Sequence, residues 1–125
     1  MGQIEGGFVQ GQGWLTIEEV NWKSNGQITT FSPSTYKIPA VSDIPKIFNV
    51  EIFKQGKNKE KVVNKAKTTG EPPLMLAMSV FYAIKDAIAS VGKYKIIPIL
   101  DAPATPEKVL MSIRNLKNKI NHNKN

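Results

Sequence analysis

The chain has 125 residues, of which 41% are hydrophobic and 22% charged, and a formal net charge of +7 at pH 7. This size and composition predict a soluble globular protein of one domain or part of one. The absence of cysteine excludes disulfides, thiolate zinc sites and iron–sulfur ligation by this chain. No apolar run approaches the roughly 18 residues that suggest a membrane span, and the N-terminus lacks the pattern of a secretory signal. We therefore expect a cytoplasmic protein without a membrane partner.

The positive charge raises the question of nucleic-acid binding. Arg114 is the single arginine among 17 basic residues, and lysine and asparagine are most frequent in residues 115–125. Nucleic-acid surfaces usually recruit arginine and exposed aromatic residues for stacking, whereas the aromatic residues here lie within apolar patterns. We therefore expect a solvated basic surface and no nucleic-acid partner.

Residues 2–13 contain five glycines interleaved with apolar residues at helical spacing. A loop is the simplest interpretation, because each glycine costs about 1 kcal/mol in a helix relative to alanine. Gly7 and Gly11, however, would share one face of a helix, as in a helix that lets another backbone or a ligand come very close. We expect such a helix. A phosphate-binding loop is excluded, because no Gly-Lys-Ser/Thr motif follows.

Strands are predicted at two places in the next 40 residues. Residues 20–22 and 28–31 flank Asn25-Gly26, the strongest turn signal for a β-hairpin. Residues 32–45 contain three prolines and should be extended and irregular. In residues 48–52 apolar and polar side chains alternate, which predicts a half-buried strand. Residues 54–61 are expected to form a solvated loop.

Two more helices are expected in the second half. The first covers Leu74–Val91, and its polar residues fall on one narrow stripe, which predicts burial over most of its circumference. The second begins with Thr105 as its N-cap. Its apolar face comprises Val109, Leu110, Ile113, Leu116 and Ile120. The predicted fold class is α+β, with helices flanking a small antiparallel sheet.

Glu71 differs from the other carboxylates of the chain. It lies between Gly70 and two prolines, at the start of the most apolar predicted helix. A helix N-terminus stabilises an anion by about 0.3–1 kcal/mol, so a carboxylate there is ready to accept a proton as a general base. A role as a helix cap explains the same position, and from these residues alone the cap is favoured. A serine or cysteine hydrolase is excluded because the single histidine, His122, lies in the polar tail.

Four stretches in order resemble one known family: GQIEGGFVQG (2–11), PSTYKIP (33–39), GEPPL (70–74) and DAPATPE (101–107). Together they resemble the C-terminal end of the molybdenum-binding subunit of xanthine dehydrogenases, within the xanthine oxidase/aldehyde oxidase family. The GEPP form is more similar to xanthine dehydrogenases than to aldehyde oxidases. The resemblance covers residues 2–116, so residues 1–125 are interpreted as a partial molybdopterin-binding domain with a polar tail at 117–125.

The resemblance implies a role in the oxidative hydroxylation of hypoxanthine or xanthine. Glu71 stands where the family has its catalytic general base, and Gln3 stands where the family has a glutamine that hydrogen-bonds the molybdenum cofactor (molybdopterin). No residue of this chain would be a metal ligand. The 2Fe-2S clusters and FAD are expected on other parts of the assembly, and the partners would be the rest of the molybdenum-binding subunit and an iron–sulfur/FAD subunit.

Two departures from the family pattern keep an alternative open. Ala66-Lys67-Thr68 stands where the family usually has Ser-Lys-Ala, and the family's substrate-binding residues lie upstream of the matched region. The isolated chain is therefore expected to be inactive. The alternative function is a non-catalytic truncated remnant or interaction module of the same family, and a basic nucleic-acid binder is the weakest hypothesis.

Overall fold

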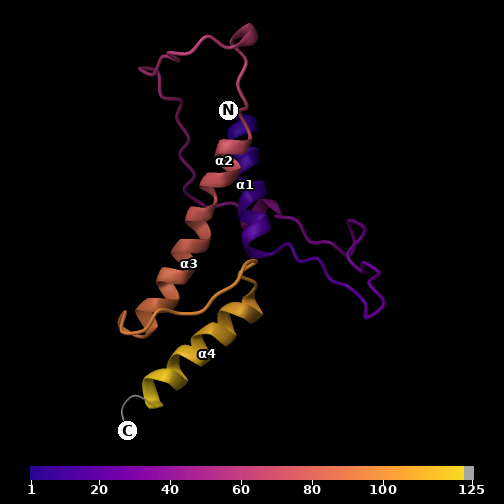
Figure 1. Ribbon diagram of the computed structural model, residues 1–125, viewed down its shortest axis with the longest axis vertical. Coiled ribbons are helices and arrows are strands. Elements are labelled where there is room, and N and C mark those ends of the chain that lie inside the picture. Colours follow the sequence, from indigo (N-terminus) through magenta and orange to yellow (C-terminus); the bar gives the residue numbers. More distant parts are fainter. Residues whose placement is uncertain (123–125) are drawn as a thin grey trace.

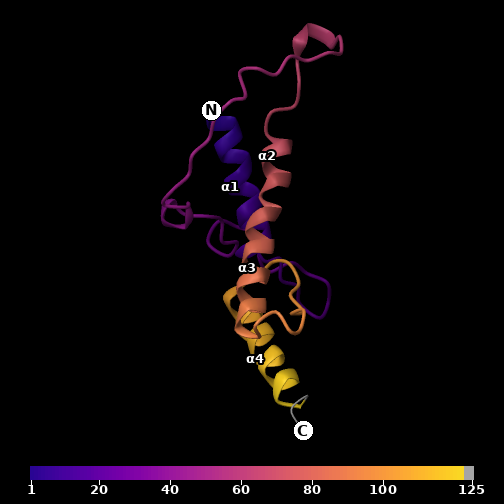
Figure 2. The ribbon, with the colours of Figure 1, turned by 90° about the vertical axis from the view of Figure 1, so that its left-hand side faces the viewer.

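The computed structural model describes residues 1–122, and its regular elements are all helices. These are α1 (Gly2–Thr16), η1 (Val41–Asp43), η2 (Val63–Lys65), α2 (Glu71–Leu76), α3 (Met78–Val91) and α4 (Pro106–His122). Figure 1 shows α1 and α2 side by side, with α3 continuing away from α2 and α4 packed near the far end of α3. The four α-helices are arranged along the long axis of the molecule in both side views (Figure 2).

The glycine-rich segment is a helix, as the spacing predicted. Gly11 faces the backbone of α2 and Ala77, the residue that joins α2 to α3: a Cβ added to Gly11 would lie 3.1 Å from the carbonyl carbon of Leu74 and 2.7 Å from the Cβ of Ala77. Ala77 is fully buried by this contact. Glycine in α1 therefore serves close helix packing, which offsets its low helix propensity.

The helix expected at Leu74–Val91 is two helices, α2 and α3, separated at Ala77. The first begins earlier than expected, at Glu71, because Pro72 and Pro73 occupy its first turn, where no backbone N–H is needed. At the junction, the N–H of Ala77 is shared between the carbonyls of Pro73 and Leu74, both at 3.2 Å. The tightened turn marks the boundary between the two helices.

The expectation that this helix is buried over most of its circumference is wrong for the described residues. Ile88 is the buried residue of α3 and Pro73 that of α2. One side of the pair is exposed, with Met75, Leu76, Met78 and Tyr82 accessible to solvent. An 18-residue window within Glu71–Val91 has a mean hydropathy of 1.6, so by length and composition this run could cross a membrane, which the sequence prediction did not include. A core helix of a soluble protein meets the same criterion.

The hydrophobic core lies between α3, α4 and the segment that joins them. Its buried members are Ile88, Leu100, Ala104 and Leu116. The expected apolar face of α4 is confirmed at Val109, Ile113, Leu116 and Ile120, whereas Leu110 is exposed. The N-cap at Thr105 is confirmed by a hydrogen bond from the Lys108 N–H to the Thr105 hydroxyl, at 3.4 Å. Helix α4 includes residues 117–122 of the polar tail; residues 123–125 of that tail lie outside the described part.

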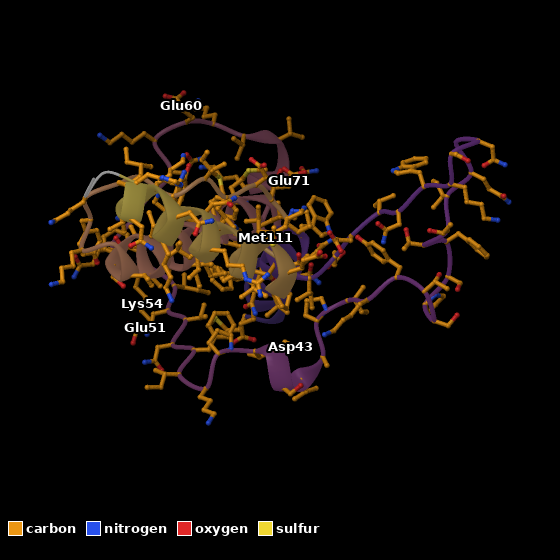
Figure 3. The ribbon with its side chains drawn as sticks, turned by 90° about the horizontal axis from the view of Figure 1, so that it is seen from below. Asp43, Glu51, Lys54, Glu60, Glu71 and Met111 are labelled. Carbon is orange, nitrogen blue, oxygen red and sulfur yellow. The ribbon has the colours of Figure 1, made fainter. Side chains whose placement is uncertain are left out.

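The predicted small antiparallel sheet is not present in residues 1–122, so the α+β fold class is wrong and the described chain is all-α. The expected hairpin forms its turn, with Gly26 at φ +82°, but its pairing is limited to an isolated bridge between Trp22 and Ile28. These residues belong to an arm (residues 17–38) that projects from the helices in Figures 1 and 3. Both bridge residues are exposed, and a hairpin without a covered apolar face is marginally stable.

The strand expected at residues 48–52 is also absent. This segment is extended without a paired neighbour, and Phe48 packs against Phe8 of α1, with ring centroids 5.2 Å apart. Aromatic pairs at this distance are favourable. Phe48 therefore packs on a helix in place of pairing in a sheet, whereas Ile52 of the same alternation is 58% exposed.

Candidate active site

A groove runs between the N-terminal half of α1 and the segment that leads into α2. Its volume is about 530 Å³, and it contains both predicted site residues, Gln3 and Glu71. We name it the Gln3–Glu71 groove. Its lining is Gly2, Gln3, Gly6, Gly7, Gln10, Lys67, Thr68, Thr69, Gly70, Glu71 and Leu74. Two residues that are far apart in the sequence thus face one hollow.

The groove exists because α1 and the start of α2 touch backbone to backbone. A Cβ added to Gly7 would lie 2.5 Å from the carbonyl oxygen of Gly70 and 3.3 Å from its Cα. That carbonyl in turn accepts a hydrogen bond from the N–H of Leu74, at 3.1 Å, in the first turn of α2. The first turn of α2, which begins with Glu71, therefore packs directly against α1.

Glu71 is the first residue of α2, and its side chain is exposed. In Figure 3 it lies beside the helices, well away from the arm and from Asp43 of η1. Gly70 is the N-cap residue, and no side-chain hydrogen bond caps α2 in the described structure. The structure therefore provides no capping bond to account for Glu71, and its carboxylate is accessible from the groove.

Gln3 lies in the first turn of α1, and its side chain is exposed to the groove. A Cβ added to either neighbour on the helix, Gly2 or Gly6, would meet nothing within 4 Å. This part of α1 presents bare backbone and open space beside a primary amide, which both donates and accepts hydrogen bonds. Such a surface fits a flat, polar heterocycle that comes close to the helix.

Gln10 and Lys67 also line the groove, although the sequence analysis did not select them. Gln10 follows Gln3 by seven residues, about two turns of an α-helix, so the same side of α1 carries both amides. This spacing was a usable signal once the segment was accepted as a helix. The position of Lys67 had no such signal, because it depends on the path of an irregular segment.

The carboxylates and the histidine do not gather into a metal site in the described part of the chain. Among residues 1–122, no group of three or more His, Cys, Asp or Glu residues lies close enough to hold a metal ion.

A larger hollow, of about 740 Å³, lies beside Met1 and residues 50–55. It includes Glu51 and Lys54, which Figure 3 shows on the same side of the molecule. The residues at 51–55 are exposed and belong to no helix or strand. The Gln3–Glu71 groove is smaller, but two packed helices support it, and this makes it the better candidate for chemistry.

Comparison with known proteins bears on this groove. Residues 1–45, which include Gln3, match the family model described as a molybdopterin cofactor-binding domain. Over 123 aligned residues the chain is 44% identical to a xanthine dehydrogenase of Oryza sativa subsp. japonica, covering 90% of the chain and 9% of the relative. The chain belongs to the xanthine dehydrogenase family.

Animal members of the xanthine dehydrogenase family give the same result. The chain is 47% identical to the xanthine dehydrogenase/oxidase of Felis catus and 48% identical to that of Gallus gallus, in each case over 87% of the chain. It spans 9% and 8% of the lengths of these two relatives. The chain thus corresponds to a small part of these xanthine dehydrogenases, and the part that it matches includes the molybdopterin cofactor-binding region.

Proposed function

We propose that this chain forms part of the molybdopterin pocket of a xanthine dehydrogenase and supplies its general base, Glu71, for the oxidative hydroxylation of hypoxanthine or xanthine. The observation that carries the proposal is that Gln3 and Glu71 line one groove. Gln3 can hydrogen-bond a polar heterocycle, and Glu71 can accept a proton. The groove therefore combines a binding group with a base, as an active site requires.

Glu71 is proposed to accept a proton from a hydroxyl group that enters the groove. Its carboxylate is exposed at the start of α2 and lines the groove, so a hydroxyl group that enters the groove can reach it. The two prolines after it restrict the backbone, and Gly70 rests against α1. A base held on a rigid support keeps its distance to the reacting group, which positioned acid–base catalysis requires.

Gln3 is proposed to hydrogen-bond the pterin part of the molybdenum cofactor, and Gln10 is placed to add a second amide contact. The bound cofactor would supply the redox centre that takes up the electrons of the substrate. The bare backbone at Gly2 and Gly6 lets a planar group come close to α1. The rest of the molybdenum-binding subunit, the 2Fe-2S clusters and FAD are proposed to lie on partner parts of the assembly.

The substitution Glu71→Gln tests this proposal in an assembled enzyme that contains this segment. The amide keeps the size of the side chain but cannot act as the base, so we expect normal molybdenum content and a turnover of xanthine lowered by about 10²–10⁴-fold. Glu107→Gln is the matched control, because Glu107 is an exposed carboxylate in the first turn of another helix, α4. It should leave turnover unchanged.

The opposite pattern would reject the catalytic role. If Glu71 only supports the start of α2, Glu71→Gln should lower the free energy of unfolding by about 1 kcal/mol. Turnover would then remain within a few-fold of the parent enzyme. Measuring stability, molybdenum content and turnover on the same preparation separates the two roles.

A further inference from the structure

Gly7 links the two proposed site residues, Gln3 and Glu71, through its position on α1. It lies one helical turn after Gln3 on α1, and it contacts Gly70, the residue directly before Glu71. A Cβ at position 7 would be 2.5 Å from the Gly70 carbonyl oxygen, and Cβ atoms essentially never come within 3.0 Å of another heavy atom. The backbone that carries Glu71 therefore sits as close to α1 as the absence of a side chain permits.

A side chain at position 7 would act directly on the turn that carries Glu71. An ordinary van der Waals contact begins at 3.4 Å, so the carbonyl of Gly70 would have to retreat by the difference from 2.5 Å, about 1 Å. The obstacle is backbone, which cannot rotate away as a flexible side chain can. Because this carbonyl accepts the Leu74 N–H, the first turn of α2 would move with it.

The neighbouring glycine behaves in the opposite way. A Cβ added to Gly6 would meet nothing within 4 Å, although Gly6 lies in the same helix and lines the same groove. The two adjacent positions differ in their contact with Gly70, so the close backbone approach is specific to position 7.

We propose that Gly7 is a positioning residue that sets the distance between the Glu71 carboxylate and the cofactor-binding face of α1 around Gln3. This inference rests on the proposed function of Glu71. A displacement of about 1 Å at a catalytic group can lower a rate by about 10²-fold. The effect on turnover is therefore expected to exceed the effect on binding of the substrate.

A purely structural role for Gly7 makes a different prediction, and Gly11 tests it. Gly11 lies one turn further along α1 and packs on α2 near Leu74 and Ala77, further from Glu71. If both glycines serve only to pack the helices, Gly7→Ala and Gly11→Ala should have similar effects. If Gly7 positions Glu71, Gly7→Ala should lower kcat much more than Gly11→Ala does.

The experiment compares Gly7→Ala with Gly11→Ala, the matched control, in an assembled enzyme that contains this segment. For each variant we would measure molybdenum content, the midpoint of thermal unfolding, and kcat and KM for xanthine. We expect Gly7→Ala to keep molybdenum and to lose about 10²-fold in kcat, with KM changed by no more than a few-fold. Gly11→Ala should lower the unfolding midpoint more than kcat.

Three results would overturn the proposal: a parental kcat in Gly7→Ala, equal losses of kcat in Gly7→Ala and Gly11→Ala, or failure of Gly7→Ala to assemble. In the last case the residue would be required for folding and not for placement. A structure of Gly7→Ala supplies an independent readout, the displacement of Gly70 and Glu71 relative to Gln3. If Glu71→Gln retains turnover while this displacement is observed, the proposed function fails and the positioning contact still stands.

Discussion

The hydroxyl of Tyr36 donates a hydrogen bond to Oε2 of Glu18, and this contact joins the two ends of the arm beside the end of α1. Glu18 is 8% exposed, so its carboxylate is one of the few buried charges of the chain. The hydrogen bond to Glu18, together with burial and the negative charge of this carboxylate, raises the pKa of Tyr36 above its ordinary value of 10.0. The arm is therefore closed at its base by a bond between two side chains.

Removing this hydroxyl should weaken the attachment of the arm. We expect Tyr36→Phe to lower the free energy of unfolding of the full chain by about 0.5–1.5 kcal/mol at neutral pH, the net value of a typical hydrogen bond. Urea titration monitored by circular dichroism measures this difference. Tyr82→Phe is the control, because Tyr82 is exposed on α3 and lies outside this contact.

The same bond should depend on pH in a defined direction. The pKa of Tyr36 is raised in the folded state, so its contribution to stability is complete below the unfolded pKa of about 10 and declines as the pH rises through the higher folded value. The stability difference between the parent and Tyr36→Phe should therefore shrink above pH 10. A difference that stays constant from pH 7 to pH 11 would show that the hydroxyl contributes nothing through this bond.

Gln3 should affect cofactor binding before it affects chemistry. In an assembled enzyme that contains this segment, we expect Gln3→Ala to lower molybdenum content, while turnover per bound molybdenum stays within a few-fold of the parent. The reason is that the amide is proposed to hold the cofactor and not to exchange protons. Gln27→Ala, in the exposed arm, should leave both quantities unchanged. Full molybdenum content with reduced turnover would instead assign Gln3 a role in the reaction.

The exposed apolar side of α2 and α3 should make the isolated chain associate with itself. Leu76 is 68% exposed and Met75 59% exposed, and burying a side chain of this size stabilises a contact by about 1.5–3 kcal/mol. We expect the purified chain to form oligomers in light scattering and to bind a hydrophobic dye. Leu76→Lys should reduce both signals, whereas Val41→Lys, at an exposed residue of η1, should not.

A monomer that unfolds cooperatively and binds no dye would contradict this expectation. It would mean that the core around Ile88 and Leu116 is sufficient by itself, despite the exposed apolar residues. If dye binding persists unchanged in Leu76→Lys, the apolar surface that binds the dye lies elsewhere. The exposed residues of the arm are then the next candidates.

Local signals were enough to predict α1 and α4. The spacing of Gly7 and Gly11 indicated a helix that receives another backbone, and α2 lies there. Thr105 caps α4 through a bond to a residue three positions along the chain, so the interaction is contained in one short stretch of sequence. The likeness of four stretches to one family also selected Gln3 and Glu71, and the structure brings both to one groove.

The strands were mispredicted because pairing is a long-range interaction. The alternation around Phe48 and the Asn25-Gly26 turn are compatible with a sheet, but a strand is stable only when a partner strand or a covering surface is present. In residues 1–122, Phe48 finds Phe8 of a helix, and the hairpin remains an exposed arm with an isolated bridge. Pattern alone does not distinguish these outcomes, because it does not show which surface, if any, covers the apolar residues.

By itself, the sequence determined where α1 and α4 form, because helix formation depends on neighbours three and four residues away. It also identified Gln3 and Glu71 as candidates. Only the tertiary structure decided that they face one groove, since their separation depends on how closely α1 and α2 pack. That closeness comes from the contact between Gly7 and Gly70, where the absence of a side chain lets two backbones touch.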